Sequence, residues 1–358
     1  MRILHTSDWH LGRGFGAVSL VDHQQAFIDW TIELCVEQRI DLVVIAGDVF
    51  DRAIAPTEAV VMFRNALQRL LAAGTKVAVI SGNHDGADRV GAYGYLLDLS
   101  GAFVRGGYAN VGEVLHLPFA DGPLDVVMLP FLDPQAAPDD LPDTAAPDDG
   151  TDDASERRIR RTHQSVLDAA IAAVRPNLTA PRSIAISHAF VAGGTISDSE
   201  RQLTVGGTGA VEASLFEGFS YTALGHLHRP QTVAQTSTVR YSGTPLAYSF
   251  SEEHSKSVTI VDMTADGICT FQEVPITVGR SVHTVTGTID DLLRAEPSPA
   301  LTEAFVRAII TDSGVVLDAK QRLAAAYPHV VEIELRPPVV AGGDTGGAGA
   351  VRSPQRCL

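Results

Sequence analysis

Acids, amides and histidines gather in five short segments of this chain, in an order suited to holding metal ions. The segments are Asp8-Trp9-His10, Gly47-Asp48-Val49-Phe50-Asp51, Gly82-Asn83-His84-Asp85, Ser187-His188 and Gly225-His226-Leu227-His228. They supply seven candidate ligands, which are Asp8, His10, Asp48, Asn83, His188, His226 and His228. Mixed imidazole, carboxylate and amide ligation suits manganese, iron or zinc better than calcium, and the lack of cysteine excludes a soft thiolate site. The pattern therefore predicts a metal centre.

Seven ligands are enough for two divalent ions, and a pair of ions has a specific use. Held about 3.5–4 Å apart, two ions generate a hydroxide nucleophile and bind the attacking and leaving oxygens of a phosphate ester. Ions so close need a shared anionic ligand, and a carboxylate can bridge them. Two ions, two carboxylates and one hydroxide sum to about +1, which suits a phosphodiester with one negative charge. The segments therefore predict phosphodiester hydrolysis.

Each of the five segments directly follows an apolar, β-rich run. The runs cover residues 3–7, 42–46, 76–80, 183–186 and 221–224. Continuous apolar runs of this length predict buried strands with both faces covered. In open α/β sheets, ligands gather at the carboxyl ends of such strands. We therefore expect the polar segments to converge on one edge, and that edge to be the active site.

Helical and β-rich patterns alternate between these segments. Helices are predicted at 22–39, 57–73 and 157–174, and β-rich stretches at 111–131 and 232–273. This composition predicts an α/β fold of two packed mixed sheets flanked by helices. The basic start of the third helix, around Arg160 and Arg161, is expected to be a solvated face.

The pattern changes after Pro275. Strand, helix, strand, helix and strand are predicted at 282–286, 289–294, 304–311, 315–326 and 330–335, without a catalytic motif. We therefore expect a catalytic domain at 1–275 and a small α+β domain at 276–338. The glycine-rich tail, 339–358, is expected to be disordered.

The charge of the chain argues against a self-sufficient DNA-binding protein. The net charge is −16, and nine of the acids lie between Asp133 and Glu156, where there is no Lys or Arg. This acidic segment, rich in Pro, Asp and Ala, is predicted to be a solvated loop. The other residues still carry −7. Attraction to a polyanion therefore needs metal ions, a few basic residues and a partner.

Several protein classes are disfavoured by composition. Cys35, Cys269 and Cys357 lie far apart and form no metal or redox spacing, so we expect ordinary reduced thiols. The N-terminus has no signal-peptide pattern, and no uninterrupted apolar stretch approaches 18 residues. We expect no membrane span and a cytoplasmic protein.

Some of the motifs are more specific than a two-metal pattern alone. They are Thr6-Ser7-Asp8-Trp9-His10-Leu11-Gly12, Ala46-Gly47-Asp48-Val49-Phe50-Asp51, Tyr241-Ser242-Gly243-Thr244-Pro245 and Ser249-Phe250-Ser251-Glu252. With these motifs the chain resembles the calcineurin-like metallophosphoesterases, and among them the SbcD-type branch of DNA repair nucleases. The resemblance covers residues 1 to about 337. It implies the fold expected above, with the small domain as a capping domain that helps hold duplex DNA.

The resemblance also implies roles for single residues. The first metal would be held by Asp8, His10 and His228, the second by Asn83, His188 and His226, and Asp48 would bridge the two. His84 would stabilise the transition state or protonate the leaving oxygen. A neighbouring carboxylate, Asp85, could orient its ring and raise its pKa. Asp51 and Asp85 are further candidates for fixing ring orientations.

The activity implied by the resemblance is that of one component of a nuclease complex. The family acts as a 3′→5′ double-strand exonuclease and a hairpin or single-strand endonuclease, with manganese as the expected metal. The implied partners are an SbcC-type ATPase, double-stranded and hairpin DNA, and a second copy of the chain within a repair and recombination complex. No amphipathic helix follows Pro338, where relatives often dock on the ATPase, so that contact is reduced or lies elsewhere.

Other interpretations of the same residues stay open. The alternative enzyme is a phosphoprotein or small-molecule phosphoesterase, although Ala53 and Asp85 stand where phosphoprotein phosphatases have glycine and glutamate. A non-enzymatic scaffold with the same fold typically loses ligands, whereas all seven positions are filled. The remaining histidines are expected to be structural: His5, His23, His116, His163, His254, His283 and His329.

Overall fold

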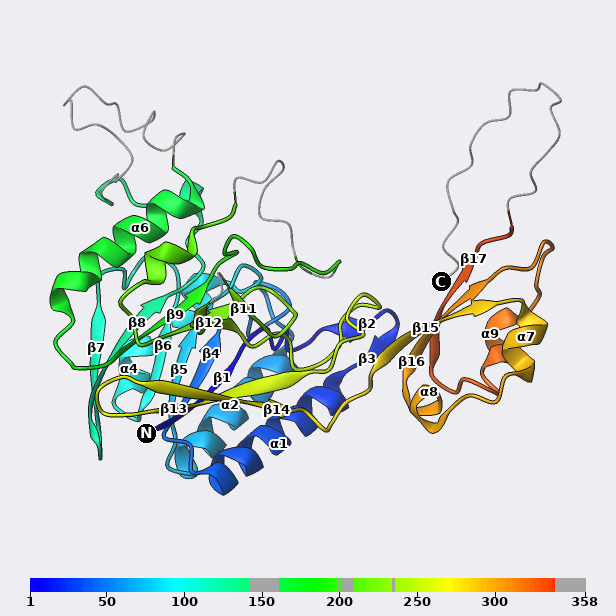
Figure 1. Cartoon of the computed structure of the whole chain (residues 1–358), viewed down its shortest axis with the longest axis horizontal. Coiled ribbons are helices and arrows are strands. Elements are labelled where there is room, and N and C mark those ends of the chain that lie inside the picture. Colours follow the sequence, from blue (N-terminus) through cyan, green and yellow to red (C-terminus); the bar gives the residue numbers. More distant parts are fainter. Residues whose placement is uncertain (142–160, 199, 201–208, 234–235, 339–358) are drawn as a thin grey trace. The chain divides into compact units, whose positions relative to one another are not determined.

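A computed structural model gives the fold of residues 1–141, 161–198, 200, 209–233 and 236–338. Figure 1 shows the chain, which divides into two compact units. The first unit comprises Met1–Arg13, Leu20–Leu246 and His254–Gly279, and the second comprises Gly14–Ser19, Ala247–Glu253 and the residues from Arg280 onward. The second unit therefore combines the C-terminal part of the chain with two short earlier segments that no sequence pattern indicated.

The first unit is built on two six-stranded sheets. One has the order β14-β13-β1-β4-β5-β6, with β1, β4, β5 and β6 parallel and β13 and β14 antiparallel to their neighbours. Its strands are β1 (Arg2–Thr6), β4 (Leu42–Ala46), β5 (Lys76–Ile80), β6 (Ala102–Arg105), β13 (Ser257–Met263) and β14 (Cys269–Pro275). The apolar runs that precede the first three polar segments are thus central, parallel strands.

The second sheet has the order β11-β12-β10-β9-β8-β7. Its strands β8, β9, β10 and β12 are parallel, while β7 and β11 run antiparallel at the two edges. They comprise β7 (Val114–Phe119), β8 (Gly122–Leu129), β9 (Ser183–His188), β10 (Tyr221–Gly225), β11 (Gln231–Val233) and β12 (Thr236–Tyr241). The two remaining polar segments follow β9 and β10.

Successive residues of each central strand point to opposite faces of its sheet, so one set packs between the two sheets and the other set packs against helices. Val44 and Ala46 of β4 belong to the apolar cluster that also contains Ile184 and Ile186 of β9, so this cluster fills the space between the sheets. The other face of the first sheet packs on α1 (Val21–Gln38) and α2 (Thr57–Ala72), and that of the second sheet on α6 (His163–Val174). Figure 1 shows α6 on one side of the sheets and α1 and α2 on the other. Both faces of the central strands are covered, as their continuous apolar sequences require.

Short elements complete the first unit. They are α3 (Ala87–Gly91), α4 (Gly94–Asp98), and the 3₁₀ turns at Pro134–Ala136, Arg175–Asn177 and Ala213–Phe216. No helix among the described residues is long and apolar enough to cross a membrane.

The second unit contains a three-stranded parallel sheet, β15 (Val282–Gly287), β16 (Phe305–Ile310) and β17 (Val330–Leu335). Its helices are α7 (Ile289–Arg294), α8 (Pro299–Glu303) and α9 (Ala319–Leu323), and a two-stranded ribbon is formed by β2 (Gly14–Phe15) and β3 (Val18–Ser19). Phe15 stacks on Phe305 at 5.3 Å and meets Phe250 edge to face at 4.9 Å. These rings join the two earlier segments to the C-terminal part of the unit.

Two predictions about the third helix need correction. The third helix begins at His163 and not at 157, because Thr162 caps it through Ser165. Arg161 is not a solvated residue: it is buried, and it donates to the carbonyl oxygens of Ala137, Pro138 and Leu141. Residues 157–160, most of the acidic segment and the tail 339–358 lie outside the described residues.

The helix predicted at 315–326 is shorter than expected and is preceded by one that was not expected. Only Ala319–Leu323 is helical, and Pro299–Glu303 forms the unpredicted α8. The acidic segment is also partly ordered at its beginning, where Asp133 caps a 3₁₀ turn. Helices of only five residues are too short to show a clear helical period of apolar residues in the sequence.

Candidate metal centre

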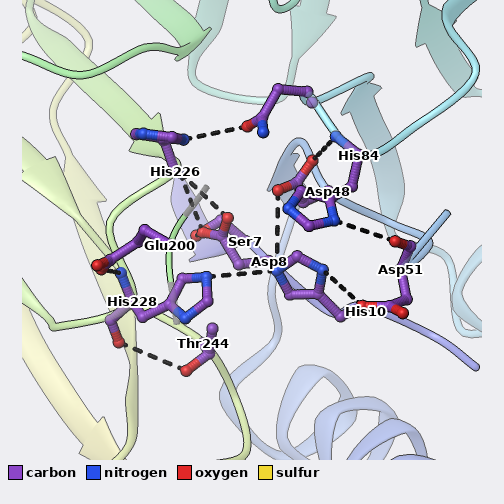
Figure 2. Close-up of polar contacts among 12 residues, drawn as sticks. Ser7, Asp8, His10, Asp48, Asp51, His84, Glu200, His226, His228 and Thr244 are labelled. Carbon is purple, nitrogen blue, oxygen red and sulfur yellow. Dashed lines mark hydrogen bonds and ion pairs between the residues drawn. The ribbon is translucent and has the colours of Figure 1, made fainter. Parts of the chain in front are cut away.

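The five polar segments meet at the carboxyl ends of β1, β4, β5, β9 and β10. Figure 2 shows side chains from the first, second, third and fifth of these segments facing one another. Adjacent loops are joined by backbone hydrogen bonds from Asp8 to Gly47 at 3.0 Å and from His10 to the carbonyl of Asp48 at 2.9 Å. The predicted ligands Asp8, His10, Asp48, His188 and His228 recur in the clusters whose donor atoms lie within 4.8 Å of one another.

One set of donors gathers around Asn83. Its Oδ1 lies 2.9 Å from His188 Nε2 and 3.1 Å from His226 Nδ1. Two donors that bind one ion at about 2.1 Å lie roughly 3 Å apart, so these three atoms fit a common ion. Asp48 Oδ2 lies 3.6 Å from the same His188 nitrogen. These residues are the set that was expected for the second metal.

The other set gathers around His10. Its Nε2 lies 3.4 Å from His228 Nε2 and 3.7 Å from Asp48 Oδ2, and Asp8 belongs to the same cluster. Asp48 Oδ2 is therefore close to one imidazole of each set, as a bridging carboxylate must be. The donor chemistry and the spacings fit a pair of divalent ions.

The ring partners on the far side decide which imidazole nitrogen faces the centre. His188 Nδ1 donates to the carbonyl oxygen of Ala46 at 2.9 Å, which leaves the lone pair on Nε2 directed at Asn83. His10 Nδ1 faces Asp51 Oδ1 at 3.8 Å, and its Nε2 faces His228. The rings are thus oriented with a nitrogen lone pair available to a cation.

Burial keeps these rings neutral. It lowers the pKa of His10, His188 and His226, and for His10 and His226 the neighbouring histidines lower it further. A neutral imidazole is the form that binds a metal ion. Burial also raises the pKa of Asp8, and the charge of Asp48 adds to this effect, a repulsion that bound cations would reverse.

The loops adopt backbone conformations that few residues tolerate. Asp8, His10, Asp48 and His226 have φ values of 54°, 44°, 49° and 108°. Gly82 allows a close approach, because a Cβ at this position would lie 2.1 Å from Asp48 Oδ1. The glycines of the motifs therefore let the ligand loops pack directly against one another.

His84 and Asp85 are adjacent in sequence but have separate surroundings. The His84 ring donates through Nδ1 to the Asp51 carbonyl oxygen at 3.0 Å, and its backbone amide donates to Asp48 Oδ1 at 2.8 Å. No hydrogen bond joins His84 to the Asp85 carboxylate among the described contacts. Asp51 therefore orients the ring, a role the sequence had suggested for Asp85.

The Asp85 carboxylate instead accepts three backbone hydrogen bonds. They come from Val49 at 3.1 Å, Phe50 at 2.8 Å and Gly82 at 2.8 Å. Burial, with a contribution from Asp48, raises the pKa of Asp85 to about 7. Asp85 thus ties the loop after β4 to the loop after β5, which is a positioning function.

Residues outside the five motifs also support the ligands. Gln24 donates to the His10 carbonyl oxygen at 2.9 Å, and Glu200 accepts from the His228 amide at 2.7 Å. The His228 carbonyl oxygen is contacted by Thr244 N at 3.1 Å and by His254 Nε2 at 3.2 Å. Of these residues only Thr244 lay in a motif singled out from the sequence. No local pattern marks Gln24, Glu200 or His254.

Other histidines have the structural surroundings expected of them. His5 is fully buried, with Nδ1 2.8 Å from the Tyr221 hydroxyl and Nε2 3.1 Å from the Leu224 carbonyl oxygen. His116 pairs with Asp125 at 2.7 Å.

Comparison with known proteins identifies the family. Residues 1–230 match the family described as calcineurin-like phosphoesterase. The chain belongs to this family. Residues 278–355 match a second family, SbcD_C, described as type 5 capsule protein repressor C-terminal domain. These matches confirm the expected fold class and the expectation of a phosphoesterase that uses divalent metal ions.

A curated relative narrows the relationship to the SbcD-type branch. The chain is 37% identical over 289 residues to the D component of the nuclease SbcCD of Bacillus subtilis (strain 168), an alignment that covers 78% of this chain and 71% of the relative. The expected resemblance is thus confirmed. Solved structures include a dimetal phosphatase from Danio rerio (13% identity, TM-score 0.46) and TT1561 of Thermus thermophilus (11%, 0.40). Each alignment covers 77% of this chain and 98% of the other.

Proposed function

We propose that the chain is the nuclease component of an SbcCD-type complex and hydrolyses DNA phosphodiesters with two metal ions. The observation that carries the proposal is the convergence of all seven expected donor groups at the carboxyl ends of strands from two packed sheets, in a homologue of an SbcD nuclease. Asp8, His10 and His228 hold one ion, Asn83, His188 and His226 hold the other, and Asp48 bridges them.

The chemistry divides between the ions and the side chains. When bound, two divalent ions supply a hydroxide nucleophile at neutral pH and electrophilic stabilisation of the phosphate oxygens. We assign manganese because the resemblance to the SbcD-type branch implies it, and the mix of imidazole, carboxylate and amide donors suits manganese as well as iron or zinc. The protein fixes the donors in place through burial and through partners on the far side of each ligand, such as Ala46 for His188.

His84 is the proposed acid of the reaction. Its Nδ1 is committed to the Asp51 carbonyl oxygen, so Nε2 is the nitrogen that can donate to substrate. The ring centroid lies 4.8 Å from that of His10, a proposed ligand of the first metal, which supports this role. An imidazolium there can protonate the leaving oxygen or stabilise the charge of the transition state.

The substrate class can be tested directly. Purified protein is incubated with end-labelled duplex and hairpin DNA, first with manganese and then with magnesium. We expect manganese-dependent 3′→5′ shortening of the duplex and cleavage at the hairpin. Hydrolysis of phosphoprotein or of small monoesters, with no DNA cleavage under either metal, would contradict the nuclease assignment in favour of the alternative phosphoesterase.

The proposed macromolecular partner is an SbcC-type ATPase that brings DNA to the site. The physical reason is the charge of the chain, which attracts a polyanion poorly. We expect weak cleavage of long duplex by the chain alone and stronger cleavage with its cognate ATPase and ATP. Efficient, salt-resistant degradation by the chain alone would contradict this dependence.

A second copy of the chain is the other proposed partner. Four apolar side chains around α4 are exposed: Tyr93 at 70%, Tyr95 at 66%, Leu96 at 69% and Leu99 at 91%. Clustered exposed apolar groups mark association surfaces. We expect a dimer in sedimentation experiments, and dissociation by Leu96→Asp with Leu99→Asp. The matched control is Ile268→Asp, which alters an isolated apolar side chain that is 63% exposed. A monomeric wild-type chain would contradict the proposal.

A further inference from the structure

Two buried serines lie behind the Asp8 carboxylate. Ser7 and Ser242 are 235 residues apart in sequence, and neither is exposed to solvent. Their hydroxyl oxygens lie 2.8 Å apart, and the Ser7 hydroxyl donates to Asp8 Oδ2 at 2.5 Å. Figure 2 shows Ser7 against Asp8, on a different side from His10. A continuous chain of hydrogen bonds therefore runs from Ser242 through Ser7 to Asp8.

The direction of this chain follows from the number of protons. A hydroxyl group donates one hydrogen bond, and Ser7 uses its proton on the Asp8 carboxylate. The proton between the two serines must therefore come from Ser242. Each donor in such a chain polarises the next, so Ser242 strengthens the bond that Ser7 makes. Asp8 also accepts from the His226 amide at 3.1 and 3.2 Å.

The fold makes specific provision for Ser242. Ser7 directly follows β1 of the first sheet, while Ser242 directly follows β12 of the second, so the two hydroxyls join the ends of the two sheets. The next residue, Gly243, has φ 75°, and a Cβ there would lie 2.7 Å from the His228 carbonyl oxygen. Glycine thus allows the turn that brings Ser242 to Ser7 beside the ligand loop.

We propose that Ser242 and Ser7 form a positioning relay that holds Asp8 in the orientation needed at the first metal position. The inference rests on the metal ligands proposed above. Neither serine binds the ion; both act through Asp8. Partners behind a metal ligand fix its orientation, and their loss typically weakens metal binding about 10- to 100-fold. The relay also gives the Tyr241-Ser242-Gly243-Thr244-Pro245 motif a physical function.

The chain offers a matched control for the simpler alternative, in which these serines only fill space. Ser187 is another fully buried serine beside a proposed ligand, His188. Its hydroxyl has no hydrogen-bond partner within the described part of the chain. Replacing Ser187 by alanine therefore removes a buried hydroxyl near the second metal position without breaking a relay.

The test measures manganese binding to the metal-stripped full chain by calorimetry. Ser7→Ala should weaken one of the two binding events about 10- to 100-fold and leave the other within about 3-fold. Ser242→Ala should weaken the same event by less. The double variant should match Ser7→Ala, because Ser242 acts only through Ser7. Ser187→Ala should bind both ions as the wild type does.

Several outcomes would overturn the relay. The relay is refuted if Ser7→Ala binds both ions as the wild type does, or if it loses affinity equally at both binding events. It is also refuted if the losses of affinity add in the double variant. Absence of two binding events in the wild type would overturn the metal assignment itself and the relay with it. If Ser7→Ala does not fold, as judged by melting without metal, Ser242→Ala decides alone: a loss at one event supports the relay, and no loss overturns it.

Discussion

Replacing Asp85 by asparagine tests whether this residue fastens two loops or takes part in the chemistry. The change keeps the shape and removes one acceptor oxygen. Oδ1 accepts from Phe50, and Oδ2 accepts from both Val49 and Gly82. Asparagine loses least when its oxygen stays toward Val49 and Gly82, which leaves its NH₂ group facing the Phe50 amide. One backbone donor, that of Phe50, then loses its partner.

The cost can be estimated from the number of lost hydrogen bonds. A buried donor left unsatisfied costs about 1–3 kcal/mol. That is a substantial part of an ordinary domain's stability of about 5–15 kcal/mol. Because the two loops carry Asp48 and Asn83, both metal-binding events should weaken as well.

The assay is urea unfolding of the metal-free protein at neutral pH, followed by metal titration. We expect a loss of about 1–3 kcal/mol in the free energy of unfolding for Asp85→Asn. Asp133→Asn, which affects an exposed 3₁₀ cap, is the comparison and should cost about 1 kcal/mol or less. If Asp85→Asn kept the wild-type free energy of unfolding but lost most of its turnover, the reasoning would be refuted. Asp85 would then act in catalysis and not in positioning the loops.

Three further predictions follow from the site. His84→Gln should retain both ions yet lower turnover by roughly 10²–10⁴. Asp48→Ala should instead weaken the binding of both ions. A His84→Gln variant that released metal would contradict the assignment of His84. Burial lowers the pKa of His5 from 6.5 to about 3, so stability is full above pH 6.5 and falls by up to about 1.4 kcal/mol per unit as the pH drops toward 3. Between pH 7 and pH 4, the free energy of unfolding in urea should therefore fall less steeply for His5→Gln than for the wild type. Equal pH slopes for the two proteins would contradict this prediction. Glu200→Ala should weaken metal binding, because it removes the acceptor of the His228 amide. Glu200→Gln keeps an acceptor oxygen and should restore most of the binding. Equal metal affinities of the two variants would contradict this role of Glu200.

The sequence was sufficient to predict the strands that carry the site. Continuous apolar runs such as Leu42–Ala46 have the length of strands and are short for helices, so they predict buried strands, and each polar segment follows one. The carboxyl ends of parallel strands in one sheet share an edge, so these local rules group the polar segments that follow each sheet. That the edges of the two sheets meet is a property of the complete fold and not of a local pattern.

Long-range contacts account for what the sequence did not predict. Arg161 has the character of a surface charge in any local window, yet it is buried among backbone carbonyl groups of a distant loop. Glu200 reaches the His228 amide across 28 residues, and Asp85 binds backbone amides that no residue pattern reports. Such partners depend on the complete fold and not on a period or motif.

The assembly of the second unit illustrates the same limit. Phe15 lies five residues after His10, and Phe250 lies in the second of the two segments that precede the C-terminal part. Phe15 nevertheless packs against both Phe250 and Phe305. A sequence pattern can reveal that these residues are apolar. It cannot reveal that they belong to the core of the C-terminal part.

Anomalous diffraction from manganese-soaked crystals tests the central claim most directly. We expect two manganese peaks about 3.5–4 Å apart, on either side of the Asp48 carboxylate. One should lie against Asp8, His10 and His228, and the other against Asn83, His188 and His226. A single peak, or a pair away from Asp48, would contradict the two-metal account.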